Sequence, residues 1–287
     1  MKRVHLNGQL LPEEQAHIPV TDRGFLFGDG VYEVIPAYAG KLFRLEEHLT
    51  RLQNSLDGVR IGNPHTPTEW RTLLQQLLEA NHASEADYSI YLQITRGSAP
   101  RRDHAFPQDI SPTVFVSATP IIKPADEIYR QGVSAITLED TRWKQCHIKA
   151  ITLLPNILLR QQAVEAGAAE AILLKEGYLT EGAASNVFIV LKGEILTPFK
   201  SPELLPGITR DVVLELAQQN GLACREAKIS AQQLREAEEI WITSSTREVM
   251  AVTLLDGQQV GDGKPGPLWS SIYTYYQAFK KQLRQLA

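Results

Sequence analysis

Cysteine is scarce in this sequence. Only Cys146 and Cys224 occur among 287 residues, and they stand far apart. The paired spacings that zinc sites and disulfide frameworks use are therefore lacking, and we expect both residues to be reduced thiols. The seven histidines are scattered and would need ligands from elsewhere in the chain to bind a metal. We therefore expect no metal site.

Long apolar runs and concentrations of one charge are lacking as well. No stretch approaches the ~18 consecutive apolar residues of a membrane span. The first 20 residues, interrupted by Asn7, Gly8 and Pro12, have no apolar core of a signal peptide. Lys and Arg total 29 against 33 Asp and Glu, with no long run of either sign. These absences argue against nucleic-acid and membrane partners and predict a cytoplasmic protein.

Several common catalytic motifs are missing too. The sequence has no Walker phosphate loop and no His-Glu-x-x-His helix, and Gly28-x-Gly30 lacks the third glycine of a dinucleotide-binding fingerprint. Residues 182–185 read Gly-Ala-Ala-Ser, which is not the Gly-x-Ser-x-Gly turn of the α/β-hydrolases. The chemistry must therefore be sought in other patterns.

Helical and strand patterns are mixed along the chain without a strict alternation of the two. Apolar residues at helical spacing predict helices over 45–59, 154–165 and 268–286. Alternating or continuous apolar residues predict strands such as 88–94 and 239–243. This mixture predicts an α+β fold.

The length of the chain favours two domains over one. The proline-containing segment 120–125 is the best candidate for a linker, because new elements begin on its C-terminal side. We therefore expect an N-terminal α+β domain over residues 1–119 and a C-terminal domain over 126–287.

One candidate site is Gly207-Ile208-Thr209, which stands directly before a helix expected to begin near Arg210. Free backbone N–H groups and the helix dipole at such a position favour a bound phosphate. Thr209 could equally be an ordinary N-cap, which is the commoner role of such a residue. Taken alone, this pattern leaves both possibilities open.

A second candidate is the hydroxyl-rich run 243–246, Thr-Ser-Ser-Thr, at the end of the strand predicted over 239–243. Ligands of mixed sheets often lie at strand ends, where small residues let the backbone approach them. An ordinary polar turn has the same composition. This run is therefore a site only if another feature points to it.

A third candidate is Lys149, in the mostly uncharged segment 146–152 that precedes a predicted helix. Apolar neighbours can desolvate a lysine and favour the neutral amine, which attacks aldehydes. Most lysines instead keep their charged end in water. The local sequence alone does not decide between these two roles.

These residues also belong to a larger pattern. Asp22-Arg23-Gly24, followed by residues 27–34 (Phe-Gly-Asp-Gly-Val-Tyr-Glu-Val), resembles the N-terminal signature of the fold-type IV pyridoxal-phosphate enzymes, the class IV aminotransferase family. The ending Val-Tyr-Glu-Val is similar to D-amino-acid aminotransferases. Four further blocks follow in the family order, and they are 47–52, the segment around Lys149, 180–188 and 207–211. The resemblance covers about residues 4 to 275.

The resemblance implies roles for the cofactor site. Lys149 would hold pyridoxal 5'-phosphate as a Schiff base and later move the substrate's α-proton. Glu181 would face the pyridine nitrogen and keep it protonated. Arg51 would pair with the phosphate, and Leu205 would pack on one face of the ring. The remaining phosphate contacts would come from Ile208, Thr209, Ser244 and Ser245.

The resemblance also implies how substrate is bound. Tyr32 would be catalytic and, with an Arg-x-His element, would hold the substrate's α-carboxylate. Arg102-Asp103-His104 fits this spacing, although anchoring on Pro100 would select Arg101 instead. In this family pattern the Arg-x-His loop reaches in from the partner of a homodimer.

The implied protein is a two-domain enzyme with a smaller N-terminal α/β domain, a larger C-terminal domain and the cofactor at their interface. The implied reaction is a ping-pong transamination between a D-amino acid of the D-alanine or D-glutamate type and a 2-oxo acid. The family also contains 4-amino-4-deoxychorismate lyases and L-branched-chain aminotransferases, which share Lys149 and Glu181. A metabolite-binding protein without catalysis is the alternative from another class. Ala183 and Ala184 depart from the family, because relatives often have serines there.

Overall fold

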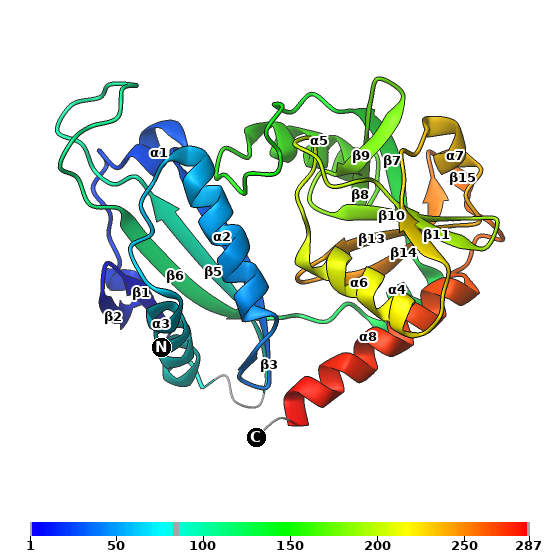
Figure 1. Ribbon diagram of the computed structural model, residues 1–287, viewed down its shortest axis with the longest axis horizontal. Helices are drawn as coiled ribbons and strands as arrows, with labels where there is room; N and C mark the ends of the chain where they lie inside the picture. Colours follow the sequence, from blue (N-terminus) through cyan, green and yellow to red (C-terminus); the bar gives the residue numbers. More distant parts are fainter. Residues whose placement is uncertain (1, 83–85, 286–287) are drawn as a thin grey trace. The chain divides into compact units, whose positions relative to one another are not determined.

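The computed structural model describes residues 2–82 and 86–285 (Figure 1). Contacts within the chain divide it into two compact units. Unit 1 consists of Met1–Ile121, Ile148–Leu153 and Leu283–Ala287, and unit 2 consists of Ile122–His147 and Leu154–Gln282. Each unit combines helices with its own sheet, which confirms the predicted α+β class.

Unit 1 contains an antiparallel sheet of six strands in the order β2-β1-β6-β5-β3-β4. The strands, in that order, are β2 (Gln9–Pro12), β1 (Arg3–Leu6), β6 (Thr113–Pro120), β5 (Asp87–Thr95), β3 (Gly30–Tyr38) and β4 (Lys41–Leu42). The helices of this unit are η1 (Glu13–Gln15), α1 (Arg23–Phe27), α2 (Leu45–Val59) and α3 (Pro67–Ala80).

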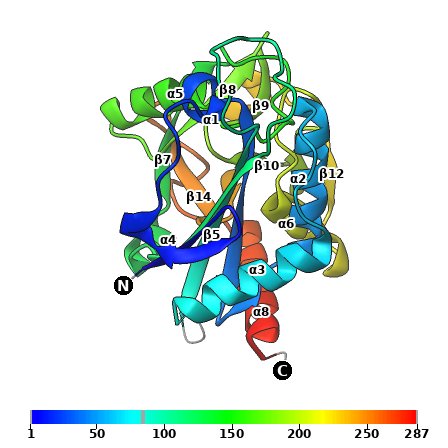
Figure 2. The same ribbon diagram turned by 90° about the vertical axis from the view of Figure 1, so that its left-hand side faces the viewer.

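Helices α2 and α3 cover the apolar face of this sheet (Figures 1 and 2). The buried leucines of α2 recur at helical spacing, and they pack with alternate apolar residues of β3, β5 and β6. Thr66 caps α3 by accepting from the Glu69 N–H, and the Glu69 carboxylate accepts from the Thr66 N–H in return. Burial of α2 therefore fixes which of its side chains face β3.

Residues Ile148–Leu153 belong to unit 1 because they pair with the start of β3. The Tyr32 N–H donates to the Lys149 carbonyl at 2.9 Å, and the Ile151 N–H donates to the Gly30 carbonyl at 3.1 Å. Val31 and Ala150 form an isolated bridge between these two bonds. This assignment differs from the boundary expected from sequence, which left Lys149 with residues 126–287.

Unit 2 contains a mixed sheet in the order β12-β11-β10-β13-β14-β7-β8-β9, with β15 paired to β14. Its strands are β7 (Val133–Glu139), β8 (Glu170–Lys175), β9 (Tyr178–Gly182), β10 (Asn186–Leu191), β11 (Glu194–Thr197), β12 (Cys224–Glu226), β13 (Glu239–Ser244), β14 (Glu248–Leu255) and β15 (Gln258–Gln259). The helices are α4 (Asp126–Gln131), α5 (Leu154–Glu165), α6 (Ile208–Gln219), α7 (Ala231–Arg235) and α8 (Pro267–Gln285), of which α8 ends within the residues of unit 1.

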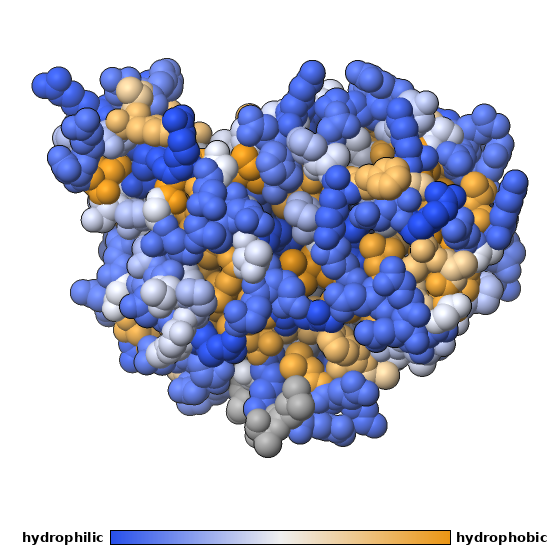
Figure 3. Space-filling model, viewed as in Figure 1, coloured by the Kyte–Doolittle hydropathy of each residue, from blue (hydrophilic) through white to orange (hydrophobic). Residues whose placement is uncertain are grey.

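Strands β10 and β13 form the centre of the unit 2 core. Nearly all of their side chains are buried, and α6 packs against β13 (Figure 1). The surface seen in Figure 3 is largely hydrophilic, with smaller apolar areas between the charged side chains. Among the helices in the described parts of the chain, none is both long enough and apolar enough to cross a membrane.

Candidate active site

Lys149 lies in unit 1, where backbone hydrogen bonds hold it on both sides. Its N–H donates to the Ser55 hydroxyl of α2 at 3.1 Å, and its carbonyl accepts from Tyr32. Its Nζ lies 4.3 Å from the centroid of the Tyr32 ring. The predicted lysine and the predicted tyrosine are therefore neighbours, with the amine over an aromatic face that favours a cation.

A buried ionic cluster stands in the same unit. The Arg51 guanidinium donates to both oxygens of Glu33 at 2.8 Å each, and His48 Nδ1 lies 2.8 Å from Glu33 Oε2. His48 and Arg51 are three residues apart in α2, so both point at β3. Sequence reasoning missed this partner of Arg51, because Glu33 stood out only as one letter of a family motif.

Charge and burial act in opposite directions on this cluster. Burial would raise the pKa of Glu33, but the Arg51 charge outweighs it and holds that pKa far below its usual range. Burial lowers the pKa of His48 despite the nearby carboxylate, and the positive charges of Arg51 and Lys149 add to this effect. A neutral His48 can donate from Nδ1 to Glu33, and its buried Nε2 then has no hydrogen-bond partner among the described residues.

Glu181 in unit 2 is the centre of a second buried cluster. Its Oε2 accepts from the Leu205 N–H at 3.0 Å and from the Asn186 amide at 3.2 Å, and its Oε1 accepts from Arg142. Arg142 also donates to both oxygens of Asp140, at 2.9 and 2.8 Å. Two carboxylates therefore share one guanidinium.

The protonation of Glu181 follows from this sharing. Burial raises the pKa of Glu181 to about 7, although Arg142 opposes the rise and Asp140 adds to it. Asp140 itself keeps a pKa below its usual value, because Arg142 outweighs its burial. Glu181 can therefore hold or release a proton near neutral pH.

Asn186 connects this cluster to the start of α6. Its amide donates to the Leu205 carbonyl at 2.8 Å as well as to Glu181. A Cβ added to Gly207 would lie 1.9 Å from Asn186 Oδ1, so only glycine fits there. Gly207 is the N-cap of α6 and offers no capping side chain. The alternative that Thr209 is the N-cap is therefore wrong, because the helix begins at Ile208.

The hydroxyl-rich run 243–246 begins with the last two residues of β13 in the same unit. Thr243 pairs with Asn186 across β13 and β10, so this strand end lies beside the residue that contacts Gly207. The Thr243 hydroxyl is buried and has no hydrogen-bond partner in the part of the chain that the structure describes. A buried hydroxyl without a partner next to uncapped helical N–H groups fits an anion such as a phosphate.

The predicted substrate residues of the Arg-x-His element lie in the loop 97–112 of unit 1. The Arg102 guanidinium lies 4.8 Å from the Phe27 ring centroid, and the His104 ring lies 5.3 Å from the same ring. Arg101 and Arg102 are both exposed, and it is Arg102 that makes this contact. Phe27 therefore brings together the two residues that the spacing selected.

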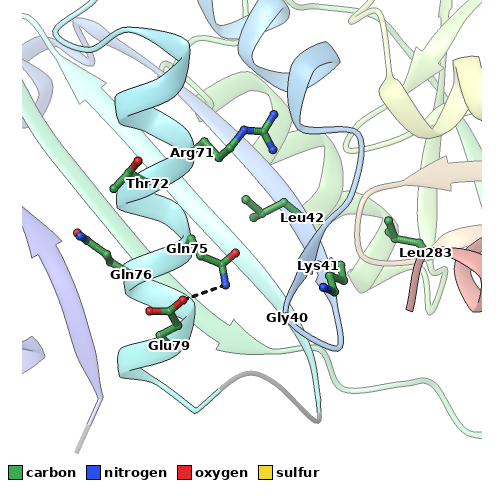
Figure 4. Close-up of a pocket in the computed structure, with 9 residues that line it drawn as sticks. All are labelled: Gly40, Lys41, Leu42, Arg71, Thr72, Gln75, Gln76, Glu79 and Leu283. Atoms are coloured by element: carbon green, nitrogen blue, oxygen red, sulfur yellow. Dashed lines mark hydrogen bonds between the residues drawn. The ribbon is translucent and has the colours of Figure 1, made fainter. Parts of the chain in front are cut away.

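A hollow of about 530 Å³ lies elsewhere in unit 1, between α3 and the β3–β4 turn (Figure 4). Polar side chains such as Thr72 and Gln75 line it, and Gln75 donates to Glu79 at 3.3 Å within its wall. None of the predicted site residues is among its lining residues. Among residues 2–82 and 86–285, no three His, Cys, Asp or Glu side chains are grouped as a metal site requires.

Comparisons with known proteins match both units. The model of the family "Amino-transferase class IV" matches residues 30–255. The D-alanine aminotransferase of Bacillus licheniformis is 42% identical over 275 residues, which is 96% of each chain. That of Listeria monocytogenes serotype 1/2a is 39% identical, over 96% of this chain and 94% of its own.

Solved structures agree with this match. The branched-chain amino acid aminotransferase of Escherichia coli superposes with a TM-score of 0.90 at 27% identity, covering 96% of this chain and 94% of its own. The branched-chain amino acid aminotransferase of T.th., solved with pyridoxamine 5'-phosphate, gives 0.91 at 29% identity, with 98% and 95% covered. The fold and the family signature thus point to one group of enzymes.

Proposed function

Because the chain belongs to the class IV aminotransferase family, we propose that it transfers the amino group of a D-amino acid to a 2-oxo acid. Its cofactor is pyridoxal 5'-phosphate, which this family uses. The observation that carries the choice of a D-amino acid is the 42% identity with a D-alanine aminotransferase over 96% of both chains. The donor is of the D-alanine or D-glutamate type, and the reaction is ping-pong.

Lys149 is the residue that bonds to the cofactor and moves the proton of the substrate's α-carbon. The bound cofactor supplies an electron sink for the carbanion that proton loss creates. The contact between Lys149 Nζ and the Tyr32 ring, 4.3 Å from its centroid, supports a joint role for these two residues. The backbone of Lys149 is held on both sides, by the Ser55 hydroxyl and by the Tyr32 N–H, which fixes the position from which its side chain starts.

Glu181 would face the ring nitrogen of the cofactor and keep it protonated. Asp140 and Glu181 together carry two negative charges when ionised, against one positive charge on Arg142. One further cation would balance the charges of this buried cluster, and a protonated pyridine is such a cation. Leu205, whose N–H donates to Glu181 at 3.0 Å, would pack against the ring of the cofactor.

The phosphate of the cofactor is bound mainly by unit 2. The N–H groups of Ile208 and Thr209 at the uncapped start of α6 act as donors, together with the hydroxyls of Ser244 and Ser245. The buried Thr243 hydroxyl, which has no hydrogen-bond partner among the described residues, supports a polar group here. Arg51, whose guanidinium is oriented by Glu33, is the proposed charged partner of the phosphate.

The substrate's α-carboxylate is bound by Arg102 and His104 together with Tyr32. The Phe27 contact favours Arg102 over its neighbour Arg101, since it holds the guanidinium of Arg102 next to His104. A bidentate pair between this guanidinium and a carboxylate would fix the α-carbon for proton transfer. Amines without a carboxylate would then be poor donors.

The active protein is a cytoplasmic homodimer whose partner subunit completes the substrate site. Helix α5 offers an apolar surface for a second subunit, because the side chains of Leu154, Ile157 and Leu158 are each 56 to 65% exposed. Light scattering after gel filtration tests this, with Ile157→Glu as the disrupting variant and Gln161→Glu on the same helix as its control. A monomeric wild-type protein that is fully active would contradict the dimer.

A substrate panel tests the reaction. D-Alanine and D-glutamate should each drive amino transfer to 2-oxoglutarate or pyruvate, and Lys149→Ala should abolish it. Borohydride reduction and peptide mapping should find a pyridoxyl group on Lys149. L-Leucine as the sole donor would identify an L-branched-chain aminotransferase, as the structural neighbours are named, and pyruvate release from aminodeoxychorismate would identify a lyase. No adduct on Lys149 would favour a non-catalytic binding protein.

A further inference from the structure

Asp29 joins two buried arginines in unit 1. Its Oδ2 accepts from Arg23 Nε at 2.7 Å and from Arg96 Nε at 2.8 Å, and its Oδ1 accepts from Arg96 Nη2 at 3.0 Å. Arg23 and Arg96 are 4% and 7% exposed. Burial alone would raise the pKa of Asp29, but hydrogen bonds from the two arginines keep it below its usual value. Asp29 is therefore an ionised bridge between two cations.

Arg23 directs its remaining donors to the loop 97–112. Its Nη1 donates to the carbonyls of Asp103 at 2.5 Å and Ala105 at 3.4 Å, and its Nη2 donates to the carbonyl of His104 at 3.3 Å. Three successive carbonyls of the loop, two of them in the Arg-x-His element, thus accept from one guanidinium. Charged donors make stronger hydrogen bonds than neutral ones, so this contact holds the loop backbone firmly.

Arg96 contacts the same loop at Phe106. Its guanidinium lies 3.6 Å from the Phe106 ring centroid and donates to the carbonyls of Val59 and Arg60 at 2.7 and 2.9 Å. Those carbonyls belong to the end of α2, which is packed in the core. The loop is therefore tied through Arg96 to the rigid part of the unit.

The side chains of the loop complete the arrangement on Phe27. Arg23 and Arg102 each lie 4.8 Å from its ring centroid, and the His104 ring lies 5.3 Å away. Without Asp29, the two buried arginines would lose the carboxylate that they share, and their charges would repel each other and Arg102. The direction of Arg102 therefore depends on a carboxylate that it does not contact.

We infer that Asp29, acting through Arg23 and Arg96, is a positioning residue that presents Arg102 and His104 to the substrate's α-carboxylate. This inference rests on the proposed function, in which Arg102 binds that carboxylate. Asp29 touches neither substrate nor cofactor in this scheme. It fixes the conformation of the loop 97–112, and so it acts mainly on the binding of the amino acid.

The test combines Asp29→Asn with a matched control, Asp87→Asn. Asp87 is also a largely buried carboxylate of unit 1 with an arginine partner, Arg284, but that pair joins β5 to the end of α8 and not to the loop. Asp29→Asn should raise KM for D-alanine about 10-fold or more, with kcat changed far less. Asp87→Asn should leave both parameters near wild type even if it lowers thermal stability equally. Equal KM changes in the two variants would overturn the inference.

Two further readouts separate positioning from a general loss of structure. In an Arg102→Ala background, Asp29→Asn should add little to KM, because the residue it positions is gone. Trypsin should cut the folded Asp29→Asn protein faster at Arg101 and Arg102 than it cuts wild type. An additive KM effect, or an unchanged cleavage rate, would overturn the inference. Arg23→Lys, which keeps the charge but loses the fork of donors, should show intermediate cleavage.

The cleavage assay also separates this inference from the proposed function. It needs no substrate, so it reports the anchoring of the loop even if wild type proves inactive with D-amino acids. Lack of D-amino-acid turnover with faster cleavage in Asp29→Asn would refute the proposed function and the substrate role of the loop, while the anchoring by Asp29 would stand. Normal turnover with unchanged cleavage would refute the anchoring alone.

Discussion

Glu33 of β3 accepts two hydrogen bonds from the guanidinium of Arg51 on α2, each 2.8 Å long, and both side chains are buried. This pair fixes the orientation of Arg51, which in our proposal binds the phosphate of the cofactor. Two parallel hydrogen bonds fix the direction of the guanidinium as well as neutralising its charge. In our proposal, the pair therefore connects the packing of α2 on the sheet with the binding of the cofactor.

Replacing Glu33 by Gln should destabilise the protein strongly, because Arg51 would remain buried without its counter-charge. Breaking a buried pair in this way typically costs ~3–5 kcal/mol of unfolding free energy. Urea titration followed by circular dichroism measures the loss. Glu46→Gln serves as control, because the Glu46–Arg71 pair is exposed and should contribute much less. Equal stability of Glu33→Gln and wild type would contradict a structural role for the pair.

Glu181→Gln should bind the cofactor but transaminate slowly. An amide cannot carry the negative charge that keeps the ring nitrogen protonated, so kcat should fall on the order of 100-fold. Stopped-flow measurement of the first half-reaction isolates this step from product release. Glu176→Gln, in the exposed turn before β9, is the control. An unchanged rate in Glu181→Gln would remove Glu181 from the ring nitrogen.

The two buried carboxylates should respond to pH in opposite ways in the cofactor-free protein. The pKa of Glu33 is lowered in the folded state, so its contribution to stability is complete above about 4.5 and is lost as the pH falls further. The pKa of Glu181 is raised from 4.5 to about 7, so its contribution is complete below 4.5 and is lost as the pH rises to 7. Wild type should therefore lose stability relative to Glu181→Gln between these two pH values, as measured by urea unfolding in a pH series. A constant difference across the series would contradict the raised pKa.

Gly207→Ala should weaken cofactor binding, since the new methyl group would collide with Asn186 Oδ1. The backbone of Gly207 is in an extended conformation that alanine can adopt, so the effect is one of space and not of backbone strain. We expect the Kd for pyridoxal 5'-phosphate to rise about 10-fold or more, as read from fluorescence titration of the cofactor-free protein. Gly62→Ala, which meets open space, should leave the Kd unchanged. Unchanged affinity in both variants would contradict a phosphate-binding site at the start of α6.

Local patterns in the sequence predicted much of the fold. The helices expected over 45–59 and 154–165 have those bounds in the structure, because apolar spacing at 3.6 residues is a strong signal over long stretches. The strand β14 (Glu248–Leu255) was not predicted, although it lies in the centre of the unit 2 sheet. Nearly all of its residues are buried, so the alternation that marks a half-exposed strand is missing.

The site was predictable only where it belongs to ordered motifs. Lys149 and Glu181 follow from the family blocks, but nothing in the local sequence pairs Arg142 with Glu181, which are 39 residues apart. Long-range ionic contacts of this kind have no periodicity that a sequence pattern could reveal. Asn186 stood in a motif, yet its role beside Gly207 depends on strand pairing with β13. The assignment of Lys149 to unit 1 likewise depends on backbone contacts with β3.

Unit 1 is formed by three separate segments of the chain, so it cannot fold completely from its first segment alone. All six strands of its sheet are encoded before residue 122, but Ile148–Leu153 and the end of α8 also belong to the unit. Arg284 donates to both oxygens of Asp87, which joins the end of α8 to an early strand. On the ribosome, unit 1 therefore cannot reach its final state until Arg284 has been synthesised. The hydrophobic core of unit 1 also stays incomplete until Ile148 and Ala150 have been made.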